Sequence, residues 1–129
     1  MSKVIELAPY ITVGRYHRGS GLWDREQGLK AAKDHNFLAD MPTDVTFKIP
    51  PGIPMDDSFL KALLGPLARK VGVENLKVTV VGGHSGGSLH GYYNRCPSTA
   101  RQVEEYLVLE SIAVKKRQEE KAKAAQGAK

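Results

Sequence analysis

Residues 45–71 join a strand pattern to a helix pattern through a segment that fits neither. Val45-Thr46-Phe47-Lys48-Ile49 alternates apolar and polar side chains, which is typical of a half-buried strand. Pro50-Pro51-Gly52-Ile53-Pro54 must end that strand, because proline cannot donate to a sheet ladder. Apolar side chains then recur at helical spacing: Phe59, Leu60, Leu63, Leu64, Leu67 and Val71. A strand that leads through a tight turn into a helix favours an α/β fold.

Further strands are expected on both sides of this unit. Residues 4–7 and 10–13, separated by Ala8-Pro9, are predicted to form a hairpin or a bent edge strand. Residues 76–81 are predicted as a third clear strand, and residues 88–93 as a weak edge strand. Between these last two strands lies a loop that is too rich in glycine to be regular.

Helix signals alternate with these strands. Ser20 can cap a helix over about residues 22–33. Thr99 and Gln102 have capping-box spacing at the start of the last helix. Pro66 predicts a break or kink inside the helix that follows the central strand. The order of elements predicts α/β architecture, with a small mixed sheet of four to five strands and helices mainly on one face.

The length and charge distribution indicate one domain and a basic extension. A chain of 129 residues with 41% hydrophobic content supports one modest core, which we assign to residues 1–114. Residues 115–129 hold six basic and two acidic side chains, which is +4 of the net charge of +5. We expect this basic segment to be a helical or flexible tail. The remaining 114 residues are nearly neutral, so basicity is a property of the tail.

Targeting and redox signals are absent from the sequence. No apolar run reaches the roughly 20 residues of a membrane helix, and residues 1–6 lack the apolar core of a signal peptide. Cys96 is the single cysteine, so no intramolecular disulfide can form. We expect a soluble cytoplasmic protein that does not contact a membrane.

Ser58 is the most conspicuous functional candidate. Its position predicts the first turn of the helix, directly after Asp57, which can cap that helix. The start of a helix receives negative charge well, because its N–H groups lack intrahelical partners and its dipole is positive there. A capping or solvent-facing hydroxyl with no modification is the alternative interpretation.

The same segment carries a resemblance to a known family. Met55-Asp56-Asp57-Ser58-Phe59-Leu60 with Leu63-Leu64-Gly65 resembles the signature of STAS domains, the fold of anti-sigma factor antagonists. Asp57 and Phe59 stand where many antagonists have serine and glycine. The order and rough spacing over residues 10–81 resemble the shorter STAS-like branch that accompanies histidine-kinase-like ATPases. Its matches are Gly14-Arg15-Tyr16, Ser20-Gly21, Arg25-Glu26, Asp57-Ser58-Phe59-Leu60 and Leu64-Gly65-Pro66-Leu67.

The resemblance implies a binding module that is not an enzyme and needs no cofactor. It implies a protein partner, in particular a histidine-kinase-like ATPase, and Ser58 as the phosphoacceptor. The implied partner-binding residues are Asp56, Asp57, Ser58, Phe59, Arg15 and Arg25. A phosphate on Ser58 would add about two negative charges beside two carboxylates and would repel a partner packed there.

A second interpretation is a small subunit of a larger assembly, nucleic-acid-associated or phage-encoded. Its attachment surfaces would be the basic C-terminal helix and the loop over residues 82–95. The residues that carry this alternative are Lys115, Lys116, Arg117, Lys121, Lys123, Tyr92, Tyr93 and Arg95. Basic side chains interleaved with tyrosines suit nucleic acid, although a Lys/Glu/Ala-rich helix is more often a solvated end.

Enzyme and metal chemistry have weaker support in the sequence. Gly83-His84-Ser85-Gly86-Gly87 matches the G-x-S-x-G motif of hydrolases, but no Asp follows Asp57 and no His follows His90 to complete a triad. His84, His90 and Cys96 lack the close pairing of a zinc site. We therefore expect neither a catalytic triad nor a metal centre.

Overall fold

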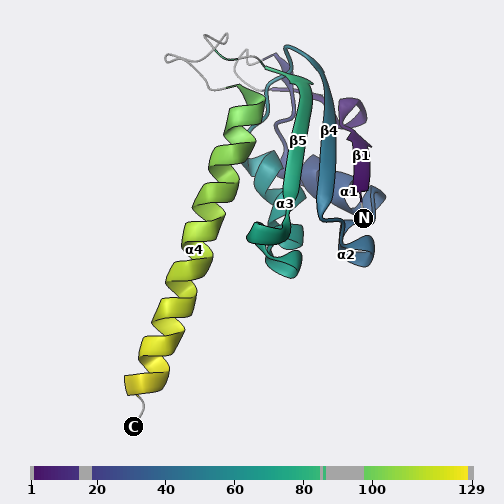
Figure 1. Ribbon diagram of the computed structural model, residues 1–129. Coiled ribbons are helices and arrows are strands. Elements are labelled where there is room, and N and C mark those ends of the chain that lie inside the picture. The colour runs from purple at the N-terminus through teal and green to yellow at the C-terminus, as the bar shows by residue number, and fades with distance from the viewer. Residues whose placement is uncertain (1, 15–18, 85, 87–97, 128–129) are drawn as a thin grey trace.

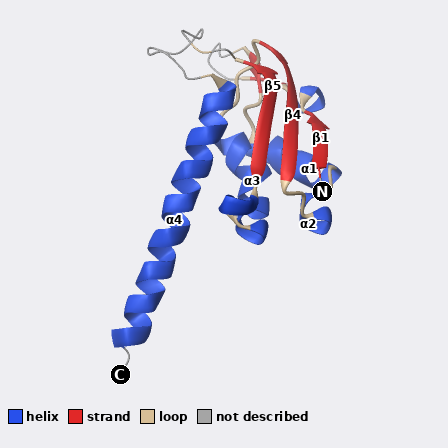
Figure 2. Ribbon diagram, viewed as in Figure 1, coloured by secondary structure: helices blue, strands red, loops and turns tan. Residues whose placement is uncertain are grey.

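The computed structural model describes residues 2–14, 19–84, 86 and 98–127. Within them the chain forms an α/β structure with a three-stranded sheet, helices on one side of it, and a long C-terminal helix (Figure 1). Strands and helices alternate along the chain, as the sequence pattern predicts. Figure 2 separates the strands from the helices that lie behind them.

The sheet contains β1 (Ser2–Glu6), β4 (Asp44–Pro51) and β5 (Lys77–Gly83) in the order β1-β4-β5. Both pairings are parallel, so the described sheet is not mixed. The expected number of four to five strands in one sheet is also wrong for these residues. The strand that contains Val45 and Phe47 lies at the centre, which explains its strong apolar alternation.

The predicted pairing of residues 4–7 with residues 10–13 is wrong. Strand β1 instead pairs with β4, and the turn η1 (Ala8–Tyr10) follows β1. The separate antiparallel pair joins β2 (Thr12–Val13) to β3 (Ser20–Gly21). A parallel pairing requires a long crossover between its strands. Neighbouring residues in the sequence therefore could not reveal the partner of β1.

Helices α1 (Arg25–Asp34) and α3 (Asp57–Val71) cover one face of the sheet (Figure 1). The short helix α2 (Phe37–Asp40) precedes β4, and η2 (Val73–Asn75) connects α3 to β5. Helix α3 continues through Pro66 without a break. Its apolar side chains are buried on both sides of that proline, and this packing outweighs the roughly 3 kcal/mol cost of an interior proline.

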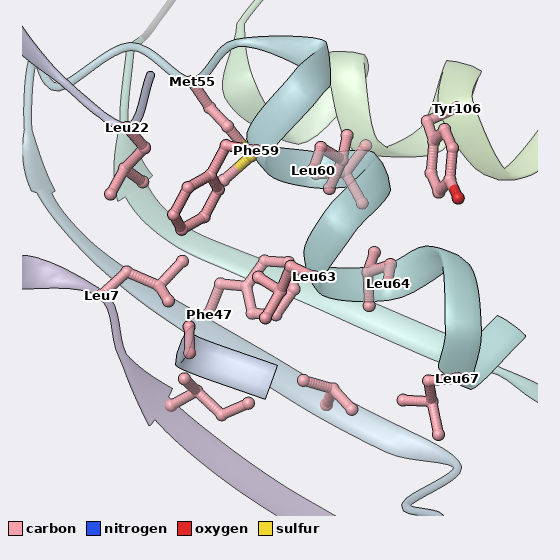
Figure 3. Close-up of a cluster of buried hydrophobic side chains, with 14 of the residues drawn as sticks. Leu7, Leu22, Phe47, Met55, Phe59, Leu60, Leu63, Leu64, Leu67 and Tyr106 are labelled. Carbon is pink, nitrogen blue, oxygen red and sulfur yellow. The ribbon is translucent and has the colours of Figure 1, made fainter. Parts of the chain in front are cut away.

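The core lies between the central strand and α3 (Figure 3). Val45, Phe47 and Ile49 of β4 point toward the helices and are buried. Helix α3 supplies the opposite wall with the fully buried side chains Phe59, Leu60, Leu63, Leu64 and Leu67. Alternation in β4 and helical periodicity in α3 thus point into the same space.

The other face of the sheet carries polar rows. One row runs across the strands as Val4, Thr46 and Thr79, and the next as Glu6, Lys48 and Val81. The carboxylate of Glu6 and the ammonium of Lys48 lie 4.0 Å apart. Parallel sheets are usually covered on both faces, and here Val4 and Val81 are more than half exposed.

Helix α4 (Thr99–Gly127) packs against the rest of the protein through its first half. Val103 and Tyr106 join the core, whereas residues 115–124 are exposed. Figure 1 shows the far end of this helix extending beyond the sheet. The basic segment is therefore helical through residue 127. Within the described residues, none of the helices combines the length and apolar content that a bilayer-spanning helix needs.

Candidate functional site

The starts of α1, α3 and α4 lie at the carboxyl edge of the sheet. Helices α3 and α4 follow the strands β4 and β5 of the sheet, whereas α1 follows β3 of the separate two-stranded pair (Figure 1). Ligands and partners of open α/β sheets commonly bind outside the carboxyl ends of the strands. This edge is therefore the first place to test the residues singled out by the sequence.

A backbone bridge between two distant segments aligns the starts of α1 and α3. Leu22 forms a parallel bridge with Met55, and the backbone N–H of Asp56 donates to the Leu22 carbonyl at 2.9 Å. Arg25 and Ser58 each lie three residues after this bridge. The structure therefore brings both candidates to one edge. Arg15 lies outside the described residues.

Ser58 is exposed in the first turn of α3, as predicted. The N-cap is Asp56, whose backbone is extended, and Asp57 is the first helical residue. The expectation that Asp57 caps the helix is therefore wrong. Its carboxylate accepts a hydrogen bond from the Gln102 side chain at 2.9 Å instead.

Gln102 does not have the capping role that its spacing from Thr99 predicts. Its side-chain amide also donates to the Met55 carbonyl at 2.8 Å, so one side chain of α4 holds both sides of the turn into α3. The capping-box spacing with Thr99 identified the residue but not its role. Ser98 performs the capping, because its hydroxyl accepts from the backbone N–H of Arg101 at 3.2 Å.

Phe59 does not belong to an exposed partner surface. Its side chain is fully buried and points into the core (Figure 3). The aromatic ring anchors the first turn of α3 from below, while Ser58 and Asp57 remain exposed above it. Of the residues predicted to bind a partner in this segment, Asp57 and Ser58 are exposed and Phe59 is buried.

Gly28 explains how closely the two helices approach. A Cβ atom at this position would lie 2.5 Å from the Phe59 carbonyl oxygen and 3.0 Å from the Ala62 Cβ. Such a distance is far below van der Waals contact, so only glycine fits between α1 and α3 here. The sequence offered one signal for this contact, a glycine inside a helical pattern.

The basic residues of the tail separate onto different sides of α4. Lys115, Arg117 and Lys121 line a groove against the end of α3, together with Arg69. Lys116 and Lys123 are exposed and do not line that groove. Tyr92, Tyr93 and Arg95 lie outside the described residues, so their predicted convergence with the tail stays a prediction.

A charge cluster lies beside that groove, between α3 and α4. Glu110 lies 4.0 Å from the Arg69 guanidinium and 3.6 Å from that of Arg117. Burial raises the pKa of the nearby Tyr106 to about 12, with a further increase from Glu110 and an opposing effect from Arg69. The tyrosine therefore stays neutral at physiological pH.

A second polar cluster ties β1 to α1 and α2 at the opposite edge of the sheet. The Lys3 ammonium lies 2.5 Å from the Asp40 carboxylate and also donates to the His35 carbonyl. The Tyr10 hydroxyl donates to Asp34 at 2.8 Å. Burial raises the pKa of Tyr10 to about 12, with help from Asp34, and burial lowers that of His35. We interpret this cluster as a structural link.

Most of the residues considered for enzyme and metal chemistry lie outside the part of the chain that the structure describes. His84 accepts a hydrogen bond from the Gly86 backbone at 3.0 Å, whereas Ser85, His90 and Cys96 fall in the residues left undescribed. Among residues 2–14, 19–84, 86 and 98–127, no group of three or more His, Cys, Asp or Glu could hold a metal ion.

Comparisons with protein-family models, curated proteins and solved structures found no match to this chain.

Proposed function

We propose that the protein is a non-enzymatic, STAS-like binding module that contacts a protein partner at the start of α3. The observation that carries this proposal is an exposed, rigidly supported turn. Ser58 and Asp57 face solvent, while Phe59 lies in the core directly behind them. A polar turn on a packed helix needs little ordering when a partner binds, which favours recognition.

The arrangement around the turn supports the same assignment. Asp57 is held by Gln102, and Arg25 begins the neighbouring helix at the same edge. Neutral N–H donors on a partner surface can meet the carboxylates of Asp56 and Asp57. The passage from β4 through the turn into α3 agrees with the strand, turn and helix implied by the STAS resemblance.

Phosphorylation of Ser58 is the proposed control. A phosphate at the first turn would be tolerated by α3, because the N-terminus of a helix favours negative charge. Beside Asp56 and Asp57 it would create a dense acidic surface. A partner that fits the unmodified turn would then be repelled.

The experiment uses a purified histidine-kinase-like ATPase of the class that acts on anti-sigma factor antagonists. We expect wild type and Ser58→Ala to bind it, and Ser58→Asp to lose binding while unfolding at the same urea concentration as wild type. Incubation with ATP should add one phosphoryl group to wild type and none to Ser58→Ala, as read by mass spectrometry. Equal affinity of all three proteins would reject the switch.

A further inference from the structure

A basic groove runs between the end of α3 and the middle of α4. It has a volume of about 620 Å³, and η2 closes one side. This basic groove is lined by Ala68, Arg69, Gly72, Val73, Glu74, Ser111, Val114, Lys115, Arg117, Gln118 and Lys121. It lies at the opposite end of α3 from Ser58, so the two surfaces can be tested separately.

Four cations line the groove, against Glu74 as the one acidic side chain of its described lining. Arg69 comes from α3, and Lys115, Arg117 and Lys121 come from α4. The tail alone had suggested a solvated basic helix. The tertiary structure adds a wall from a distant part of the chain and turns one face of that helix into a concave, positively charged surface.

Glu110 forms ion pairs with both arginines of the groove. Its side chain is 15% exposed, whereas those of Arg69 and Arg117 are 56% and 55% exposed. The Arg117 Nε also donates to the Ala113 carbonyl at 3.3 Å. Each guanidinium therefore has an acidic neighbour on one side and remains about half exposed to solvent. Guanidinium groups held in this way can offer their remaining N–H donors to an anion.

The rest of the lining decides which polyanion fits best. Its apolar members are small, and no aromatic side chain appears among the described lining residues. Peptide partners are usually held by aromatic or large apolar anchors, and single-stranded nucleic acid by stacking on aromatic rings. Arg, Lys, Ser and Gln side chains are instead the groups that contact phosphates of a duplex.

We propose that the basic groove binds the phosphate backbone of duplex nucleic acid, with no readout of the bases. The contacts are electrostatic, so affinity must fall steeply as salt rises. This activity is independent of partner binding at Ser58. It would place the module on a nucleic acid while its other end remains free.

The test uses the full-length protein and a fluorescent DNA duplex of arbitrary sequence. Binding is measured by anisotropy between about 50 and 200 mM salt, a range in which phosphate contacts produce a clear slope of log K against log salt. We expect Lys115→Ala/Lys121→Ala to flatten this slope by about 2 and Arg69→Ala by about 1, because each contact releases roughly one counterion.

The matched control is Lys116→Ala/Lys123→Ala, which removes the same charge from α4 outside the groove. We expect this variant to keep most of the affinity and slope of wild type. An equal loss in both double variants would overturn the groove and assign binding to diffuse tail charge. No duplex binding by wild type, or tighter binding of polyglutamate than of duplex, would overturn the nucleic-acid proposal. Circular dichroism confirms that each variant is folded.

Discussion

The start of α3 and the far half of α4 are both helical, yet different forces stabilise them. At the start of α3, a buried aromatic ring, a glycine contact with α1 and two hydrogen bonds from Gln102 fix the backbone. The residues from Lys115 to Ala124 are exposed. Their helix depends on local propensity, on a few side-chain contacts and on continuation of the packed first half.

We therefore expect the two candidate surfaces to respond differently to mutation. A surface residue at the start of α3 acts on a rigid support, so its substitution changes recognition more than shape. One wall of the basic groove comes from α3, and the other comes from the part of α4 that is largely exposed to solvent. Its function therefore depends on charge and on the contacts of Arg69, Glu110 and Arg117 across the two helices.

The largest effect is expected from Phe59→Ala. The side chain is fully buried, so its removal should lower the free energy of unfolding by about 3–5 kcal/mol. Ile112→Ala in α4 is the counterpart, because that side chain is 57% exposed and should change stability by less than about 0.5 kcal/mol. Urea unfolding measures both. A comparable loss at Ile112 would mean that another surface covers this part of α4.

Gly28→Ala should have the next largest effect on stability. Alanine normally stabilises a helix by about 1 kcal/mol relative to glycine, but here its Cβ would collide with the Phe59 carbonyl. We expect a net loss of about 1–3 kcal/mol in thermal unfolding. Gly65→Ala is the control, since its Cβ would lie 3.4 Å from the Tyr106 hydroxyl, an ordinary contact. A stabilised Gly28→Ala protein would contradict the close approach of α1 and α3.

Gln102→Ala should lower stability by about 1–2 kcal/mol. It removes the hydrogen bonds to the Met55 carbonyl and the Asp57 carboxylate. The exposed neighbour Arg101, which pairs with Glu105, offers a control whose substitution by alanine should cost less than about 0.5 kcal/mol. Hydrogen exchange of the first turn of α3 should accelerate in Gln102→Ala. An unchanged exchange rate in that turn would mean that the Gln102 hydrogen bonds do not stabilise it.

The smallest effect concerns Tyr106 at high pH. Its pKa is about 12 in the folded protein and about 10 when unfolded. The folded state therefore retains the proton longer, so this contribution to stability is complete below pH 10 and is lost as pH rises toward 12. Tyr106→Phe should show a shallower fall in unfolding free energy above pH 10 than wild type. A residual fall remains, because the pKa of Tyr10 is raised to the same value. Identical pH profiles would remove Tyr106 as a source of the alkaline decline.

Local patterns predicted the central elements well. The strand over 45–49 lies within β4, and the helical spacing from Phe59 to Val71 coincides with α3. The exposure of Ser58 was also predictable, because it occupies a polar position before an apolar run. Strand partners were not predictable, since β1 pairs with β4 across about forty residues. The predicted capping roles of Asp57 and Gln102 were wrong for the same reason. The two side chains contact each other across 45 residues, which a local pattern does not reveal.

Periodicity and charge are local properties, so the residue pattern was enough to predict an α/β chain, its central strand and helix, and a basic C-terminal segment. The parallel sheet and the support of the turn by the buried Phe59 became visible in the folded protein alone. The same holds for the groove across which Arg69 faces Lys115, Arg117 and Lys121. These features depend on which distant surfaces pack together. The hydrophobic effect is non-directional, so a local apolar pattern does not specify its packing partner.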